Sequence, residues 1–250
     1  MIDPKILQEH GVSVKTVELA LERAIQNAFA DYLNVLECEV DLDTRVATAI
    51  MQVSQDLLIN EARVFSPGAV EGDRLPVTFD LESLPEEVME KVKSLLIEII
   101  PNIHAEETYD RFKPMVHRAV RGIIGHRGRD LVDVDLGSGL AALFPRVHWT
   151  KNEEELYRPG EEFTFYVLRA LREEAAVVAI LSRNSIELPC AIPRQEMPWA
   201  DFRCLRRIAG YKSWIQSNDF VRGEIREKLV DELRGELVDI SFFSWLLQKT

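Results

Sequence analysis

Residues 130–146 read DLVDVDLGSGLAALFPR and decide the fold class of this chain. Over residues 132–136, Val, Val and Leu alternate with two Asp residues, which is the period-two pattern of a strand with one buried face. The run Gly137-Ser138-Gly139 predicts a turn. Residues 140–144 then return as a partner strand, so this stretch is predicted to form a β-hairpin.

Three more short apolar runs surround this hairpin. We predict strands at residues 116–124, 163–169 and 177–182, with a turn at Tyr157-Arg158-Pro159-Gly160. Five strands within roughly 70 residues match the size of a five-stranded OB-type β-barrel. Barrels of this type often bind single-stranded nucleic acid. The central part of the chain is therefore predicted to be a nucleic-acid-binding barrel.

The N-terminal part has a mixed α and β pattern. Ser13 is the predicted N-cap of a helix whose apolar stripe runs from Val17 to Tyr32. Residues 34–53 are predicted to form a hairpin that turns at residues 41–45. Further turns are predicted at Ser66-Pro67-Gly68 and Glu71-Gly72-Asp73.

A long helix is predicted to lead from this part toward the barrel. Ser83 and Glu86 have the spacing of a capping box. The helix has one apolar stripe, made of Val88, Val92, Leu95, Leu96 and Ile99. Pro101 is expected to kink or end the helix, because proline has no backbone N–H to donate. A second segment at residues 105–112 then leads to a domain boundary at Pro114.

The composition is that of a soluble globular protein. Of the 250 residues, 46% are hydrophobic and 29% are charged, and no run of about 18 apolar residues predicts a membrane span. The first residues lack the pattern of a signal or transit peptide. Cys38, Cys190 and Cys204 are widely spaced, which favours reduced, structural thiols. We therefore expect a cytoplasmic protein without membrane contact.

The charge is unevenly distributed along the chain. Residues 1–110 contain 8 Lys and Arg against 22 Asp and Glu, a balance of −14, whereas residues 111–185 contain 12 against 10, a balance of +2. Residues 186–250 contain 10 of each. An acidic part joined to nearly neutral parts suggests two partners of different charge. The plainer alternative is that the acidity keeps the N-terminal part soluble.

The sequence carries no recognised catalytic pattern. Its five His residues show no zinc-binding spacing, and neither a phosphate-binding GxxxxGK[ST] loop nor a GxSxG motif is present. The acidic run Glu153-Glu154-Glu155 is expected to be solvated, although a nuclease that holds metal with scattered carboxylates is an alternative. We expect no enzyme activity, no cofactor and no bound metal.

Three segments together resemble the NusA family of bacterial transcription factors. The barrel segment, VDVDLGSGLAALFPR followed by YRPGEEFTFYVLRA and VVAILSRN, resembles the S1-type RNA-binding module of that family. Residues 56–72 and the strand that follows resemble its N-terminal domain, with Val70-Glu71-Gly72-Asp73 in place of a Val-Gly-Asp turn. Residues 230–240, VDELRGELVDI, resemble the end of its first KH domain. The segments occur in the family's order.

The basic residues around the first barrel strand predict a surface that contacts RNA. Four arginines lie within twelve residues, next to glycines that let a phosphate backbone approach closely. Phe144 and Arg146 form an aromatic and basic pair that can stack a base and hold its phosphate, although Phe144 is also a candidate for the barrel core. The candidate RNA-binding residues of the barrel are Arg118, Arg121, His126, Arg127, Arg129, Phe144 and Arg146.

The C-terminal part departs from the family pattern. A KH domain grips nucleotides with a GxxG loop between two helices. Here the corresponding residues are Phe220-Val221-Arg222-Gly223, so Phe replaces the first Gly. Arg222 is the candidate RNA contact of this loop, but the bulky Phe220 is expected to obstruct it and to pack against the apolar end near Phe242, Phe243 and Trp245. The resemblance thus implies a truncated, degenerate KH-like α/β module with a helical stripe from Ile225 to Leu237.

These observations predict an α+β multidomain protein. We expect a polymerase-binding α/β domain with a linker helix at residues 1–113, an S1-type barrel of the OB fold at residues 114–185 and a KH-like module at residues 186–250. The resemblance implies binding to RNA polymerase and to single-stranded nascent RNA, with other transcription factors as further candidate partners. Its expected role is to modulate pausing, termination or antitermination during elongation. The alternative is a free RNA-binding protein that acts on mRNA or ribosomes without polymerase.

Overall fold

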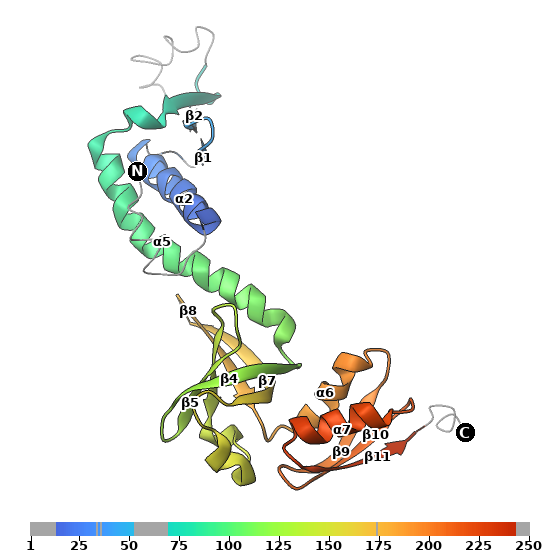
Figure 1. Cartoon of the computed structure of the whole chain (residues 1–250). Coiled ribbons are helices and arrows are strands. Elements are labelled where there is room, and N and C mark those ends of the chain that lie inside the picture. The colour runs from blue at the N-terminus through green and yellow to red at the C-terminus, as the bar shows by residue number, and fades with distance from the viewer. Residues whose placement is uncertain (1–13, 34, 36, 53–69, 174, 244–250) are drawn as a thin grey trace. The chain divides into compact units, whose positions relative to one another are not determined.

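The computed structural model describes residues 14–33, 35, 37–52, 70–173 and 175–243 (Figure 1). The predicted N-cap Ser13, the turn at residues 66–68, most of the segment 56–72 and Trp245 lie outside the described residues. The chain divides into two compact units, Met1–Glu106 and Glu107–Thr250. Among the described residues, no helix combines the length and the apolar character needed to cross a membrane.

The first unit packs two helices with a small sheet. Its elements are α2 (Val14–Leu33), β1 (Glu37–Asp41), β2 (Val46–Gln52), β3 (Arg74–Asp80), the 3-10 turn η1 (Leu81–Ser83) and α5 (Glu86–Phe112), which continues into the second unit. The sheet has the order β1-β2-β3 with antiparallel pairs. The predicted helix and hairpin are both confirmed.

The core of the first unit follows the predicted apolar stripes. Ala24, Ala28 and Phe29 of α2 are fully or almost fully buried, and Val88 and Val92 of α5 are buried in the same cluster. Small residues on α2 let the neighbouring elements approach closely, while the Phe29 ring contacts the Phe79 ring edge-on at 4.7 Å. Tyr32, at the end of the predicted stripe, is instead half exposed.

One prediction about α5 is wrong. Ser83 is not its cap, because Ser83 belongs to η1 and its hydroxyl donates to the carbonyl oxygen of Asp80 at 2.9 Å. Of the two outcomes expected at Pro101, a kink or an end, the structure excludes the end, because the helix runs from Glu86 to Phe112. Pro101 has no backbone N–H, so the helix loses one hydrogen bond to the carbonyl oxygen one turn earlier. This loss is local and leaves the turns on either side intact.

The second unit begins with five strands that close into a ring. They are β4 (Ala119–Arg127), β5 (Leu131–Asp135), β6 (Ala141–Pro145), β7 (Glu162–Glu173) and β8 (Ala176–Ser182), in the order β4-β5-β6-β8-β7. All neighbours are antiparallel except β6 and β8, which pair in parallel. The five predicted strands are therefore present. The 3-10 turns η2 (Lys113–Met115), η3 (Arg146–His148) and η4 (Lys151–Leu156) precede β4 and join β6 to β7.

Residues 130–146 form the predicted hairpin. Val132 and Val134 are buried while Asp133 and Asp135 are exposed, and Val134 lies opposite Ala142. Close packing is required at Gly122, where a Cβ atom would lie 2.5 Å from Val134 and clash with it. The first strand begins three residues later than predicted, because η2 and a left-handed backbone at His117 place residues 116–118 before the ladder.

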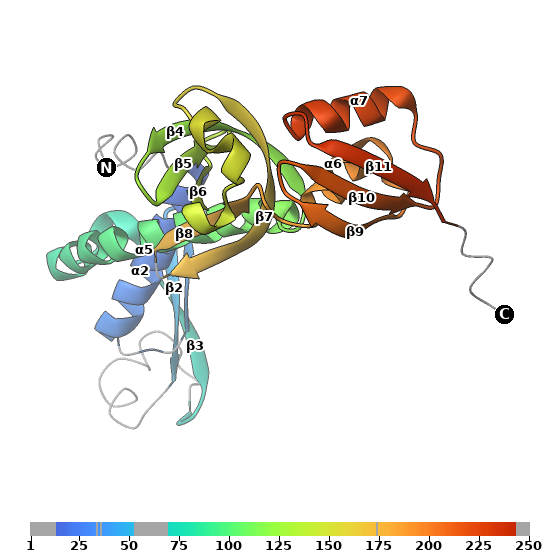
Figure 2. The same cartoon turned by 90° about the horizontal axis from the view of Figure 1, so that it is seen from below.

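The C-terminal part of the second unit is a three-stranded sheet with two helices. Its elements are α6 (Leu188–Glu196), β9 (Phe202–Ile208), β10 (Lys212–Ser217), α7 (Gly223–Glu232) and β11 (Leu237–Phe242). The sheet order is β11-β10-β9, with β10 antiparallel to β9 and parallel to β11. Both helices pack on one face of this sheet, and Figure 2 shows β9, β10 and β11 in front of α6.

The predicted helical stripe ends earlier than expected. Leu229 and Leu233 are fully buried, but Leu237 begins β11 and is 60% exposed. Arg234 and Gly235 both have positive φ angles, so the chain reverses there instead of continuing the helix. Cys190 and Cys204 are free thiols, and both contribute to this core.

Candidate nucleic-acid interface

Three arginines of the ring lie at the end where β4 turns into β5. Arg127 ends β4, Arg129 lies in the tight turn that follows, and Arg146 begins η3 directly after β6. The turn is closed by a backbone bond from Gly128 to Leu131 at 2.8 Å. Because Leu131 pairs with Pro145, the end of β6 lies beside this turn. The antiparallel pairing thus places Arg146 beside the turn that carries Arg129, although 17 positions separate their numbers.

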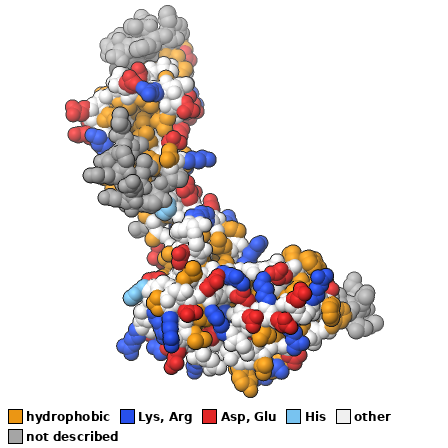
Figure 3. Space-filling model, in the orientation of Figure 1, with side chains coloured by type: hydrophobic (Ala, Val, Ile, Leu, Met, Phe, Trp, Pro, Cys, Tyr) orange, Lys and Arg blue, Asp and Glu red, His pale blue; other side chains and the backbone are white. Residues whose placement is uncertain are grey.

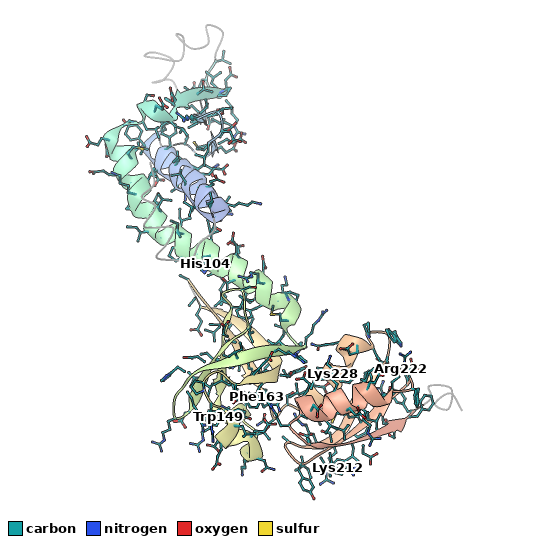
Figure 4. The ribbon with its side chains drawn as sticks, in the orientation of Figure 1. His104, Trp149, Phe163, Lys212, Arg222 and Lys228 are labelled. Carbon is teal, nitrogen blue, oxygen red and sulfur yellow. The ribbon has the colours of Figure 1, made fainter. Side chains whose placement is uncertain are left out.

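Trp149 connects two of these arginines. The guanidinium carbons of Arg127 and Arg146 lie 5.3 and 5.8 Å from the centre of the Trp149 ring. The indole of Trp149, labelled in Figure 4, is almost fully buried. Its N–H donates to the carbonyl oxygen of Phe144 at 3.0 Å, so the position of the indole is fixed. Cations over an indole face are held in place and still keep free N–H donors. We did not identify Trp149 from the sequence, where its signal was an aromatic residue three positions after Arg146.

Arg146 and Arg129 are the exposed cations of this end. The side chain of Arg146 lies 3.5 Å from Asp130 and 3.1 Å from Glu154, and all three side chains are at least one-third exposed. Exposed ion pairs of this kind contribute little, so a phosphate can compete with the carboxylates. Arg129 and His126 are also exposed. In Figure 3, blue basic side chains stand beside red acidic ones over the ring.

Phe144 is a core residue and does not present its ring to a ligand. Its side chain has no exposed area, and its ring contacts those of Tyr157 and Phe165 edge-on, each at 5.0 Å. A base could stack on Phe144 only by displacing side chains from the core of the five-stranded ring. The choice of Phe144 as an RNA contact was therefore wrong, because alternation along β6 points this residue inward.

Arg118 and Arg121 lie apart from the other arginines of the sequence cluster. Arg118 precedes β4, and Arg121 near its start forms an ion pair with Glu232 of α7. Thr164 of β7 donates a hydroxyl hydrogen bond to the same carboxylate. Burial raises the pKa of Glu232, but the bonds from Thr164 and Arg121 outweigh it and lower the pKa overall. Arg121 therefore joins the ring to α7, and it is less available to RNA than predicted.

A buried ion pair also links the ring to the C-terminal part. Arg183, which follows β8, has no exposed side-chain area and forms an ion pair with Glu153 of η4. Its Nη1 donates to the carbonyl oxygens of Thr164 at 2.6 Å and Glu232 at 3.0 Å. Burial and the nearby Glu153 raise the pKa of Tyr157, whose hydroxyl donates to this carboxylate at 2.8 Å. The prediction that Glu153 is solvated was wrong.

A second buried pair lies between β9 and the start of β11. Arg207 donates to both carboxylate oxygens of Glu236 and, through Nη1, to the carbonyl oxygens of Arg183 and Ser185 at 2.8 and 2.5 Å. Neither side chain of the pair has more than 2% of its area exposed. Burial raises the pKa of Glu236, but hydrogen bonds from Arg207 and Ser213 lower it overall. The ring and the C-terminal sheet are thus held together by fully bonded buried charges.

The predicted KH-like loop is not a loop between two helices. Residues 218–222 connect β10 directly to α7, and Arg222 is the exposed residue that precedes α7 (Figure 4). Within the described residues, Phe220 does not pack against Phe242 as expected, because Phe220 is 78% and Phe242 68% exposed. Five residues are too few for another helix with its turns, which explains why the predicted loop is missing.

Comparison with known proteins adds no assignment. No family model matches the chain, and no curated protein matches it significantly. Within the described parts of the chain, His, Cys, Asp and Glu side chains do not gather in threes in a way that would hold a metal ion.

Proposed function

We propose that this protein is a NusA-like transcription factor that binds RNA polymerase through residues 1–110 and nascent single-stranded RNA through the ring. In this role it modulates pausing, termination or antitermination and catalyses no reaction itself. The observation that carries the proposal is the closed five-stranded ring whose β4–β5 end holds Arg127, Arg129 and Arg146. The ring is then an S1-type barrel of the OB fold.

The topology of the ring supports the OB assignment. In chain order its strands lie as first, second, third, fifth and fourth, and the third and fifth pair in parallel. An OB-type barrel is a five-stranded Greek-key barrel that binds oligonucleotides on its second and third strands and on the loop between its first two strands. The corresponding loop here is the β4–β5 turn, which carries Arg129.

The charges favour this end of the ring for the RNA backbone. The exposed positions of β5 include Asp133 and Asp135, which repel phosphate. The exposed cations Arg129 and Arg146 lie at the β4–β5 end, next to Arg127. We therefore place phosphates at that end, with bases stacking on the guanidinium planes held by Trp149.

The polymerase part of the proposal rests on the first unit. Residues 1–110 have a balance of −14, which repels RNA and suits a basic protein surface. The second candidate function, a free RNA-binding protein that acts on mRNA or ribosomes, is favoured by the missing loop between two helices near Arg222. That departure from the expected KH pattern supports a C-terminal part that has diverged.

Salt-dependent RNA binding tests the ring. The double variant Arg129→Gln/Arg146→Gln replaces two exposed cations of the β4–β5 end by neutral side chains. We expect weaker binding of a single-stranded oligonucleotide, and a log–log salt slope smaller by about 0.7 for each lost phosphate contact. Lys113→Gln/Arg172→Gln removes the same charge elsewhere in the second unit and should bind like the wild type. Equal slopes and affinities for both folded variants would refute the ring site.

Co-purification from extract separates the two candidate functions. The tagged full-length protein should retain the core subunits of RNA polymerase after nuclease treatment, because the proposed contact is protein to protein. Arg129→Gln/Arg146→Gln should retain them equally well. Retention of ribosomes or mRNA without polymerase would reject the transcription-factor proposal in favour of the free RNA-binding protein.

A further inference from the structure

The C-terminal sheet has an open face whose side chains form an ordered grid. Residues that pair across strands share a face, so three rows can be assigned from the registers of β9, β10 and β11. The rows are Ile208–Lys212–Leu237, Arg206–Trp214–Asp239 and Arg203–Gln216–Ser241. All nine side chains are exposed or half-buried, whereas Phe202, Ile215 and Val238 at alternate positions are buried in the core with residues of α6 and α7.

An aromatic and cationic cluster occupies the middle of this face. The Lys212 Nζ lies 4.8 Å and the Arg206 guanidinium carbon 5.3 Å from the centre of the Trp214 ring. Beyond the third row, the Arg203 guanidinium carbon lies 5.5 Å from the centre of the Phe243 ring. Phe243 is tied to β10 by a backbone bond to Ser217 at 2.9 Å. Two aromatic rings therefore stand on the sheet, each with a cation beside it.

The face is positive although the C-terminal part is neutral. The grid contains Arg203, Arg206 and Lys212 against Asp239 alone, a balance of +2. Since residues 186–250 have 10 basic and 10 acidic residues, all other positions together have a balance of −2. Figure 4 shows Lys212 on the other side of the sheet from Lys228 of α7. The positive charge is thus concentrated on the face that the helices leave open.

We propose that this open face, centred on Trp214, is a second binding surface for single-stranded RNA. The choice of ligand rests on the proposed function, but the surface is separate from the β4–β5 end of the ring. Bases stack on Trp214 and on the guanidinium of Arg206, and Arg203 contacts a phosphate. Lys212 contacts a second phosphate in exchange for its partly exposed ion pair with Asp239, which is 3.5 Å long. A sheet with aromatic residues in its middle and cations around them suits a strand whose bases are unpaired.

Two variants of the full chain test the surface. Trp214→Ala should weaken binding of a labelled single-stranded 12-nucleotide RNA at least about fivefold, because stacking on an aromatic residue contributes that much per base. Arg206→Gln/Lys212→Gln leaves the indole in place and should weaken binding and reduce the salt slope. Lys15→Gln/Lys93→Gln, with the same change of charge in the first unit, is the control and should bind normally.

Photocrosslinking with bromouridine RNA locates the contact. The proposal expects crosslinked peptides that contain residues 203–216, and it expects their loss in Trp214→Ala. Crosslinks confined to ring peptides, with wild-type affinity in both surface variants, would overturn this inference and leave the ring site intact. Crosslinks at residues 203–216, with unchanged RNA affinity in Arg129→Gln/Arg146→Gln, would support this surface and reject the proposed RNA site at the β4–β5 end of the ring. Absence of RNA binding would reject both.

Sedimentation of the wild type and of the surface variant tests whether the same face binds a protein partner instead. If the open face pairs two copies of this chain, sedimentation will show a dimer that Arg206→Gln/Lys212→Gln dissociates, while RNA affinity stays the same. That result would overturn the RNA assignment.

Discussion

Replacing Glu153 by Gln removes the charge that faces the fully buried guanidinium of Arg183. The carboxylate accepts two bonds from Arg183, one of them at 2.8 Å to Nε, and a third from the hydroxyl of Tyr157 at 2.8 Å. Loss of one partner of a buried pair costs about 3–5 kcal/mol, because the other charge stays buried without compensation. The amide oxygen of Gln keeps one acceptor, so we expect about 3 kcal/mol for Glu153→Gln.

Tryptophan fluorescence during urea unfolding measures this loss. All four Trp residues lie at position 149 or later, so the signal reports on the second unit alone. The midpoint of unfolding should fall without a change in slope, and the melting temperature should fall by about 6–12 °C for a unit of this size. Glu196→Gln is the matched control, because the Lys228–Glu196 pair is nearly half exposed and should contribute less than about 1 kcal/mol.

A small loss in Glu153→Gln, equal to that in Glu196→Gln, would refute the reasoning. It would mean that water reaches Arg183 or that the guanidinium finds another acceptor. The carbonyl oxygens of Thr164 and Glu232 already accept from its Nη1, so neither can replace the lost charge.

Two more predictions concern the C-terminal part. Because the pKa of Glu236 is lowered in the folded protein, its stabilising contribution is present above its ordinary value of 4.5 and is lost as the pH falls through the folded-state pKa. Glu236→Gln should therefore be less stable than the wild type at neutral pH in urea unfolding, and the difference should shrink at acid pH; a difference independent of pH would contradict this. Arg222→Ala should change RNA affinity by well under about 1 kcal/mol in a direct binding titration, because its segment lacks the turn between two helices that grips RNA. A large loss of RNA binding with the fold intact would show that Arg222 is a true contact.

Local patterns predicted the elements well. The alternation over residues 132–136 assigned the buried and exposed faces of β5, and the glycine turn that follows set the partner strand. Helical spacing likewise identified the buried stripe of α5. These signals succeed because each depends on a few neighbouring residues and on which side of an element faces the core.

The contacts that hold the second unit together had no local signal. Arg183 and Glu153 are 30 positions apart, and Arg207 and Glu236 are 29 apart. In the sequence, each looked like an ordinary surface charge, because burial of a charge depends on its partner as well as its neighbours. The grid around Trp214 was missed for the same reason, since only the strand registers bring Arg206 and Lys212 to the same indole.

Buried pairs of this kind have a consequence for the proposed RNA surfaces. Replacing buried ions by apolar residues often stabilises a protein, so stability alone does not explain their presence. Here Arg183 donates to the backbone carbonyl oxygen of Glu232, and Arg207 donates to the backbone carbonyl oxygen of Arg183. These directional hydrogen bonds connect the five-stranded ring to the C-terminal sheet. We infer that these bonds fix the orientation of the β4–β5 end of the ring relative to the Trp214 face. An RNA strand that is bound at one surface then meets the other surface at a high effective concentration. Two weak sites on loosely joined modules would not give this gain in affinity.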